Sequence, residues 1–269
     1  MMIDLKKEID NSNLLDNIKY YWGYQYDLGR ESTVPYLIEQ GVFKSGDNVA
    51  EIGSAEGGVL GALVQAGAVY GLGTDIAANR LEWGREIAKV GKLNIEFVEH
   101  NIITEEPHPD WIGKFDLVIL RDVIEHLDEP IEALKNIKKI IKKGGCLWVT
   151  FPPYHSAFGG HQHTTVGRFA MIPFIHLLPE KMMLNLLKDG RKADLEEVKS
   201  IRKIQLTPKK FENASKVSGF KIKKADFYLL RPVFKMKFGL PTLKLSILGK
   251  IPFVKRYIAL EASYLLIAE

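Results

Sequence analysis

The stretch from Val49 to Gly58, with the sequence VAEIGSAEGG, combines an acidic residue with a cluster of glycines in the pattern of a cofactor-binding turn. The apolar residues around Glu51 predict a buried strand, and Gly53 allows the chain to bend sharply because glycine has no Cβ. Gly57 and Gly58 would then let the first turn of a helix approach a ligand closely. This spacing predicts the binding corner of a nucleoside-containing cofactor.

A second acidic residue, Asp75, follows the apolar run from Val69 to Leu72, so it would stand at the end of the next strand. A carboxylate at this position accepts hydrogen bonds from ribose hydroxyls. The turn also fits the sequence G-x-A-x-x-G, a variant of the dinucleotide fingerprint, which makes a nicotinamide-dependent oxidoreductase an alternative. Glu51 argues against that alternative, because its charge would repel two phosphate groups but attract a cofactor that carries an ammonium and a sulfonium.

Histidines follow two further apolar runs and are the candidates for proton transfer. His126 comes soon after the run that ends near Leu120, and it either acts as a general base or packs the loop before the next helix. His161 and His163 follow the run that ends at Phe151, and they either contact an acceptor or only hold their loop. Two histidines without an obvious third ligand are a poor metal signature, so we predict no metal site.

Strand-like apolar runs alternate with helix-like segments through the middle of the chain. We predict strands at about 49–53, 68–73, 94–98, 115–120 and 145–151, with helices at about 57–66, 78–90 and 130–142 between them. Two more strands are expected at 220–229 and 262–268. Alternation of this kind predicts right-handed crossovers and a mostly parallel sheet, which is an α/β fold.

The same pass along the chain predicts four parts. Residues 1–48 would form a helical lead-in, whose aromatic residues we expect to pack against the main domain. Residues 49–151 would form the cofactor-binding core. The segment 152–206 begins with two prolines that break the alternation, and it predicts a cap or substrate-binding insertion. Residues 207–269 would complete the sheet around a basic insertion at 231–256.

Residues 49–151 resemble the core of the class I S-adenosylmethionine-dependent methyltransferases. The resemblance rests on the order of the motifs: Glu51-Ile52-Gly53 in the first turn, Asp75 after the second strand, Asn101 after the third and FDLVILRDVIEHL across the fourth. DVIEHL is similar to the small-molecule O-methyltransferase branch. The resemblance implies a Rossmann-like, doubly wound, mostly parallel seven-stranded sheet with an antiparallel last strand, together with helical cap insertions.

S-adenosylmethionine is the cofactor that this resemblance implies. Asp75 would hold the ribose hydroxyls, Ile76 would lie against the adenine, and Asn101 would contact the adenine amino group. Ala55 departs from the family, which commonly has glycine there, and its methyl group would reshape the turn. The expected cofactor-binding residues are Glu51, Gly53, Ser54, Ala55, Gly57, Asp75, Ile76, Asn101, Ile102 and Arg121.

We therefore expect a methyltransferase that acts at oxygen on a small-molecule or glycan-type acceptor held between the core and the 152–206 insertion. Methyl transfer from a sulfonium is an in-line displacement, so the protein has to align the reactants and accept a proton. His126, His161 and His163 are the candidate catalytic residues. An NAD(P)-dependent oxidoreductase, or a cofactor-binding module without catalysis, is the alternative. Nucleic acid is not an expected substrate, because no Asn/Asp-Pro-Pro-Tyr motif follows the fourth strand.

The distribution of charge bears on the partners. In total, 37 basic and 33 acidic residues give a net charge of +4, which does not demand nucleic acid. Residues 231–256 contain seven Lys or Arg and no Asp or Glu, so they predict either a solvated loop or weak contact with a lipid-linked acceptor or a membrane surface. A single cysteine, Cys146, excludes an internal disulfide, and MMIDLKKEID has no apolar run, so we expect a cytoplasmic protein.

Overall fold

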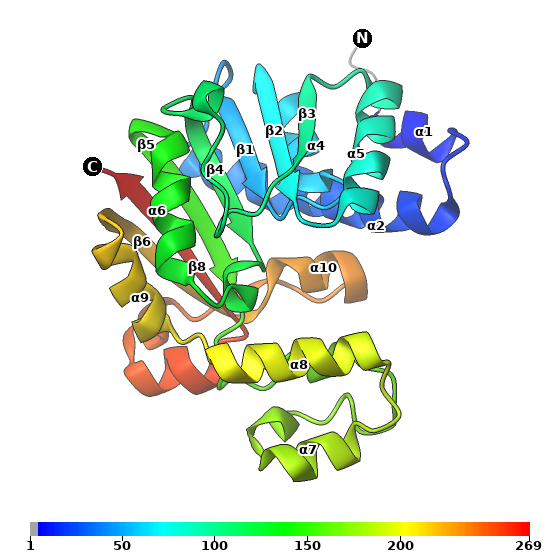
Figure 1. Ribbon diagram of the computed structural model, residues 1–269, viewed down its shortest axis with the longest axis vertical. Coiled ribbons are helices and arrows are strands. Elements are labelled where there is room, and N and C mark those ends of the chain that lie inside the picture. The colour runs from blue at the N-terminus through cyan, green and yellow to red at the C-terminus, as the bar shows by residue number, and fades with distance from the viewer. Residues whose placement is uncertain (1–4) are drawn as a thin grey trace.

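The structure is a computed structural model that describes residues 5–269, so the first four residues of the predicted lead-in lie outside the described part. One eight-stranded sheet in the order β3-β2-β1-β4-β5-β8-β6-β7 forms the centre of the molecule (Figure 1). β1 to β5 are parallel, whereas β8 runs antiparallel to both β5 and β6. The strands are β1 (Asn48–Ile52), β2 (Tyr70–Asp75), β3 (Ile95–Glu99), β4 (Phe115–Arg121), β5 (Ile141–Phe151), β6 (Phe220–Leu230), β7 (Leu243–Lys244) and β8 (Glu261–Ala268).

The doubly wound α/β fold with an antiparallel last strand is confirmed, and two details of the prediction are wrong. An eighth strand, β7, pairs with the outer end of β6. It has only two residues, which is too short to show an alternating pattern in the sequence. The helix predicted to end at 142 ends at Ile140, because Ile141 already pairs with Phe115 of β4.

Helices cover both faces of the sheet and enclose two hydrophobic cores. On one face Val49 of β1 packs with Trp22 and Leu60, and on the other Ala50 packs with Ile137 and Phe211. Both faces of the central strands are therefore buried, as expected for parallel strands between two helical layers. The helices are α1 (Leu5–Asp10), α2 (Asp16–Leu28), α3 (Val34–Glu39), α4 (Gly58–Gln65), α5 (Ala78–Gly91), α6 (Pro130–Ile140), α7 (Glu180–Leu186), α8 (Lys192–Ile204), α9 (Pro208–Val217) and α10 (Pro232–Phe238).

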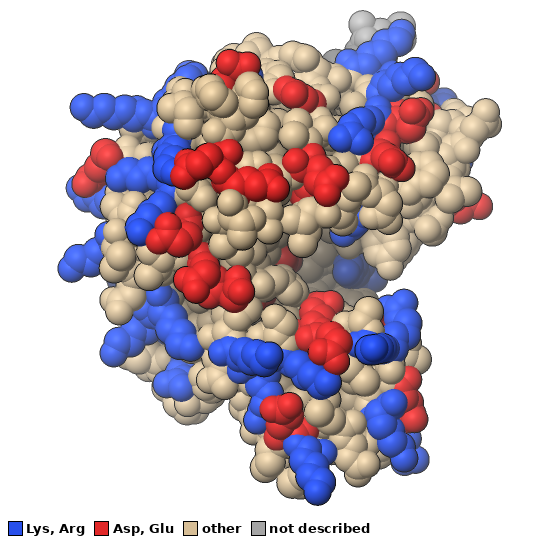
Figure 2. Space-filling model, viewed as in Figure 1, with Lys and Arg blue, Asp and Glu red and all other residues tan. Residues whose placement is uncertain are grey.

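The chain between β5 and α9 leaves the sheet and forms a separate lobe. α7 and α8 lie below the sheet in the view of Figure 1. They enclose a small apolar cluster of their own, which includes Ile175, Met183 and Val198. Figure 2 shows the surface hollowed between this lobe and the body of the sheet. The lobe is attached at the carboxyl end of β5, so it borders the crevice where α/β folds bind ligands.

A close contact between α2 and α4 fixes the first turn after β1. A Cβ on Gly58 would lie 2.8 Å from the carbonyl oxygen of Trp22 and 2.9 Å from the amide nitrogen of Tyr26. Only glycine lets the backbone of α2 come this near to the start of α4. The N-terminal helix therefore lies directly against the turn in which the predicted cofactor residues stand.

Candidate active site

A cavity of about 300 Å³ opens at the carboxyl ends of β1 and β4. This is the crevice in which open α/β sheets bind their ligands. Its wall combines the turn after β1, the end of β4, the start of the 152–206 segment, α2 and α10. The lining residues are Trp22, Tyr24, Gln25, Glu51, Gly53, Ser54, Ala55, Glu56, Gly58, Val59, Arg80, Arg121, Asp122, Val123, His161, His163, Thr164, Arg231, Val233, Phe234, Lys237 and Phe238.

Glu51 places a buried carboxylate in the cavity wall. One carboxylate oxygen accepts a hydrogen bond from the backbone N–H of Leu60 at 3.1 Å, and only 4% of the residue is exposed. Burial raises the pKa of Glu51 to about 7, although Arg121 acts in the opposite direction. A cationic ligand group would compensate for this burial, which makes Glu51 a strong candidate for contact with an ammonium.

The turn after Glu51 adopts a left-handed backbone at three positions. Gly53, Ala55 and Gly57 have φ angles of +69°, +52° and +72°. Glycine adopts this conformation at little cost, whereas alanine does so less readily. The turn is held by Asp75, whose two carboxylate oxygens accept hydrogen bonds from the N–H groups of Ala55 and Ala77, each at 2.9 Å.

The predicted cofactor residues divide into those that line the cavity and those that do not. Glu51, Gly53, Ser54, Ala55 and Arg121 line it. The remaining predicted residues lie outside the lining, namely Gly57, Asp75, Ile76, Asn101 and Ile102.

The residues outside the lining have different surroundings. Ile76 is 71% exposed, so its side chain is free to meet a ring, whereas Ile102 is buried in the core. The side-chain oxygen of Asn101 accepts hydrogen bonds from the N–H groups of Ile103 and Thr104. Roles for these residues in binding adenosine therefore stay predictions.

A buried charge network joins the ends of β4 and β6 to the start of β8. The guanidinium of Arg231 donates to both carboxylate oxygens of Asp122 at 2.6 Å and to Glu261 at 3.0 Å. Burial alone would raise the pKa of Asp122, but Arg231 and Arg121 outweigh it and hold that pKa below its usual value. After Asp122 the chain forms a short 3-10 helix from Ile124 to His126, and α6 begins at Pro130.

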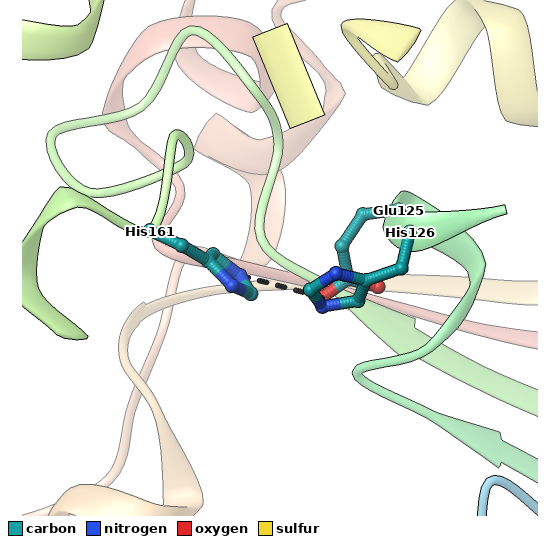
Figure 3. A group of neighbouring side chains, drawn as sticks. All are labelled: Glu125, His126 and His161. Atoms are coloured by element: carbon teal, nitrogen blue, oxygen red, sulfur yellow. Dashed lines mark ion pairs between the residues drawn. The ribbon is translucent and has the colours of Figure 1, made fainter. Parts of the chain in front are cut away.

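Glu125, His126 and His161 meet on the other side of the cavity (Figure 3). The two imidazole rings are 4.9 Å apart, and the Nε2 atoms of His161 and His126 lie 3.6 and 4.0 Å from Oε1 of Glu125. The Nδ1 atom of His161 lies 3.1 Å from a carboxylate oxygen of Glu197 in α8. Of the three histidines predicted to be catalytic, His161 and His163 line the cavity, and His126 is not among its lining residues.

His161 and His163, which both line the cavity, have pKa values that are shifted in opposite directions. Burial would lower the pKa of His161, but the carboxylates of Glu125 and Glu197 raise it to about 9. Burial and the neighbouring charge of His161 lower the pKa of His163 to about 4. At neutral pH, therefore, His161 is an imidazolium and His163 is a neutral imidazole. A pair of groups with separated pKa values is a common basis for acid and base roles.

Glu125, His126 and His161 also have the donor set of a metal site. One ligand atom from each residue lies within 4.8 Å of the others. The sequence pointed instead to the pair His161 and His163, whose rings are 5.9 Å apart. The predicted absence of a metal stays a prediction, and its test is given below.

Several lining residues were not predicted from the sequence. The aromatic residues of the lead-in were expected to pack, and Trp22 does, but Trp22 and Tyr24 also reach the cavity, together with Gln25. Arg231 and Lys237 come from the basic insertion at 231–256. The sequence indicated only that this segment is basic, not which of its residues reach the cavity. Glu197 was not singled out at all, since nothing in the sequence of α8 indicates that it faces His161.

Known proteins resemble both the core and the whole fold. Residues 50–147 match the family described as a methyltransferase domain. A ubiquinone biosynthesis O-methyltransferase of Coxiella burnetii is 27% identical over 132 residues, which make up 48% of this chain and 53% of that protein. The protein of the same name in Glaesserella parasuis is 27% identical over 153 residues, 54% of this chain and 56% of that one. The chain thus spans about half the length of the curated relatives it matches.

Solved structures share the fold at low sequence identity. A putative sarcosine dimethylglycine methyltransferase from Galdieria sulphuraria has a TM-score of 0.56 at 13% identity, with 89% of this chain and 84% of that chain covered. A possible histamine N-methyltransferase from Thermotoga maritima has a TM-score of 0.54 at 16% identity, with 94% and 95% covered. The similarity of fold therefore extends well beyond the 50–147 core.

Proposed function

Since the chain belongs to the class I S-adenosylmethionine-dependent methyltransferases, with S-adenosylmethionine as its cofactor, we propose that it methylates an oxygen atom of a small-molecule acceptor. One observation carries this proposal: a single cavity is lined by the turn after β1 and by His161 and His163 of the inserted lobe. A methyl donor held at the turn and an acceptor held at the histidines would thus share one space. The nicotinamide alternative receives no support, since the matched family is that of methyltransferases.

The cavity contains groups that fit the methionine end of the cofactor. The buried carboxylate of Glu51 would bind the ammonium. The Nε atom of Arg121 is buried without a hydrogen-bond partner among the described residues, so it can donate to a carboxylate. Buried polar atoms rarely lack a partner, which makes such an atom a sign of a missing ligand group. Asp75, Ile76, Asn101 and Ile102 would serve the adenosine end.

When bound, the cofactor supplies the methyl group on a positively charged sulfur. The protein then has to hold the acceptor oxygen in line and stabilise its negative charge. The imidazolium of His161, held between Glu125 and Glu197, would stabilise that negative charge electrostatically. The neutral imidazole of His163 would accept the hydroxyl proton, and His126 would support the ring of His161.

The acceptor is proposed to lie between the core and the 152–206 lobe. A glycan-type or lipid-linked molecule would fit the same arrangement if only its reacting end enters the cavity. We place the reaction in the cytoplasm, where the single free thiol of Cys146 would stay reduced.

Replacing His161 with glutamine is expected to lower kcat by roughly 10²–10³-fold, the range for loss of a group that stabilises developing negative charge. The affinity for S-adenosylmethionine should change little, because His161 lies on the acceptor side. The rate can be followed as release of S-adenosylhomocysteine, first with a panel of phenols, catechols and sugars to find an acceptor. His155→Gln is the matched control, since His155 contacts Arg256 outside the cavity.

Two results would contradict the proposal. Failure of every hydroxyl acceptor, together with turnover of an amine or a thiol, would exclude methylation at oxygen. Equal kcat values for His161→Gln and the unchanged protein would remove His161 from the chemistry.

Removal of divalent metals is expected to leave turnover and thermal stability unchanged. The proton on His161 already supplies positive charge between Glu125 and Glu197, so the group is compensated without an ion. Activity and the unfolding midpoint would be measured after dialysis against EDTA and again after addition of Zn²⁺ or Mg²⁺. A loss on dialysis that metal restores in the unchanged protein, and not in a Glu125→Gln variant, would assign a metal to this group instead.

A further inference from the structure

The segment from Phe238 to Ile258 exposes an unusual number of large apolar side chains. Ile247 is 77% exposed, Phe238 65% and Phe253 63%. Single exposed apolar residues are normal on a protein surface, but a dense run of them marks an interaction site. The other exposed apolar residues of the segment are Leu240, Leu243, Leu248, Ile251 and Ile258.

The segment is held against the sheet, so these side chains cannot simply fold inward. Leu245 is buried, and its N–H donates to the carbonyl of Phe227 in β6 at 2.7 Å. A Cβ on Gly249 would lie 3.1 Å from the Cβ of Phe227, so the backbone also packs closely there. Because positions 245 and 249 face the sheet, Ile247 and Leu248 between them are directed outward.

The charges around the apolar side chains have one sign. No Asp or Glu occurs between 231 and 256. Lys244 and Lys255 reach acidic partners on the body of the protein, Asp226 and Glu212. Lys250 and Arg256 have no ion pair among the described residues; Arg256 contacts His155 and the ring of Tyr257. Apolar side chains beside lysine and arginine are the composition of segments that bind anionic lipid surfaces.

We propose that residues 238–258 dock the protein onto the surface of an anionic lipid bilayer. The apolar side chains would enter the interface between headgroups and acyl chains, and Lys250 and Arg256 would meet lipid phosphates. Docking would be peripheral, since among residues 5–269 no helix is long and apolar enough to cross a membrane. Phe238 also lines the active-site cavity, so docking would leave the cavity mouth beside the lipid surface. The docking surface does not depend on the proposed reaction.

Co-sedimentation with vesicles tests this surface directly. The full chain is expected to sediment with phosphatidylcholine vesicles that contain phosphatidylglycerol, and to stay in solution with phosphatidylcholine alone. High salt should weaken binding, because it screens the lysine and arginine charges. The double variant Ile247→Glu/Phe253→Glu should bind at least about tenfold more weakly, since two apolar anchors become acidic.

Val217→Glu is the matched control. Val217 is 64% exposed on α9, outside the segment, so this variant should bind vesicles like the unchanged protein. Circular dichroism melting of all variants would confirm that they remain folded. Absence of sedimentation with anionic vesicles at low salt, or equal losses in the double variant and the control, would overturn the proposal. Light scattering that shows a dimer, abolished by the double variant in the absence of lipid, would mean that a second copy covers this surface.

Discussion

Replacing Arg231 with methionine is expected to lower the free energy of unfolding by about 3–5 kcal/mol, the range for removal of one partner from a buried ion pair. The side chain is only 13% exposed and neutralises Asp122 and Glu261 together. Without it, Asp122 in the cavity wall would keep only the longer contact with Arg121 at 3.5 Å, and the carboxylate of Glu261 would be buried without its cation. Urea denaturation at neutral pH measures the loss.

Further variants show whether uncompensated buried charge causes the loss of stability in Arg231→Met. Lys235→Met removes an exposed cation that pairs with Glu31 only 3.2 Å away, and it should cost less than about 1 kcal/mol. Adding Asp122→Asn and Glu261→Gln to Arg231→Met should recover part of the lost stability, because the uncompensated charges are gone. A loss below 1 kcal/mol for Arg231→Met alone would show that the network contributes little to folding.

Replacing Glu51 with glutamine is expected to weaken S-adenosylmethionine binding by roughly 1.5–3 kcal/mol, the range for a hydrogen bond to a charged group. This corresponds to about 10- to 150-fold in affinity. Glutamine keeps an oxygen for the N–H of Leu60, so the fold should be preserved while the charge is lost. Titration calorimetry with S-adenosylmethionine and with S-adenosylhomocysteine separates the cationic groups, since only the first carries a sulfonium.

The role of Glu51 can also be tested through the pH dependence of S-adenosylmethionine binding. Because burial raises the pKa of Glu51 to about 7, the carboxylate is charged above pH 7 and increasingly neutral below it. Affinity should therefore fall as the pH drops from about 8 to 6 in the unchanged protein, and this dependence should vanish in Glu51→Gln. Equal losses for both ligands would place Glu51 at the ammonium that they share. A loss for S-adenosylmethionine alone would place Glu51 at the sulfonium, and unchanged affinity for both ligands would show that Glu51 does not meet the cofactor.

The sequence predicts those parts of the site that depend on neighbours along the chain. Glu51 and Gly53 follow a buried run, and a strand that ends in a glycine turn has a recognisable local pattern. Glu197 has no such signal, because its role arises only where α8 passes His161. The pairing of Arg231 with Asp122 joins residues 109 positions apart, and a charge count cannot reveal which carboxylate an arginine will reach. For the same reason the sequence predicts that the lead-in packs, as Trp22 does, but not that Trp22 and Tyr24 also reach the cavity, because this is set by how α2 lies on α4.

The glycine at position 58 has a consequence for the order of events during turnover. Since the backbone of α2 rests directly on the start of α4, that wall of the cavity cannot swing outward without leaving a gap at the turn. α10 is separated from β6 by the single residue Arg231 and packs against α2, so the remaining wall is the loop of His161 in the inserted lobe. Both reactants would then pass through a single entrance on the lobe side, with the turn at its deepest point. We expect an ordered kinetic mechanism, in which the methyl donor enters before the acceptor and its demethylated product leaves last.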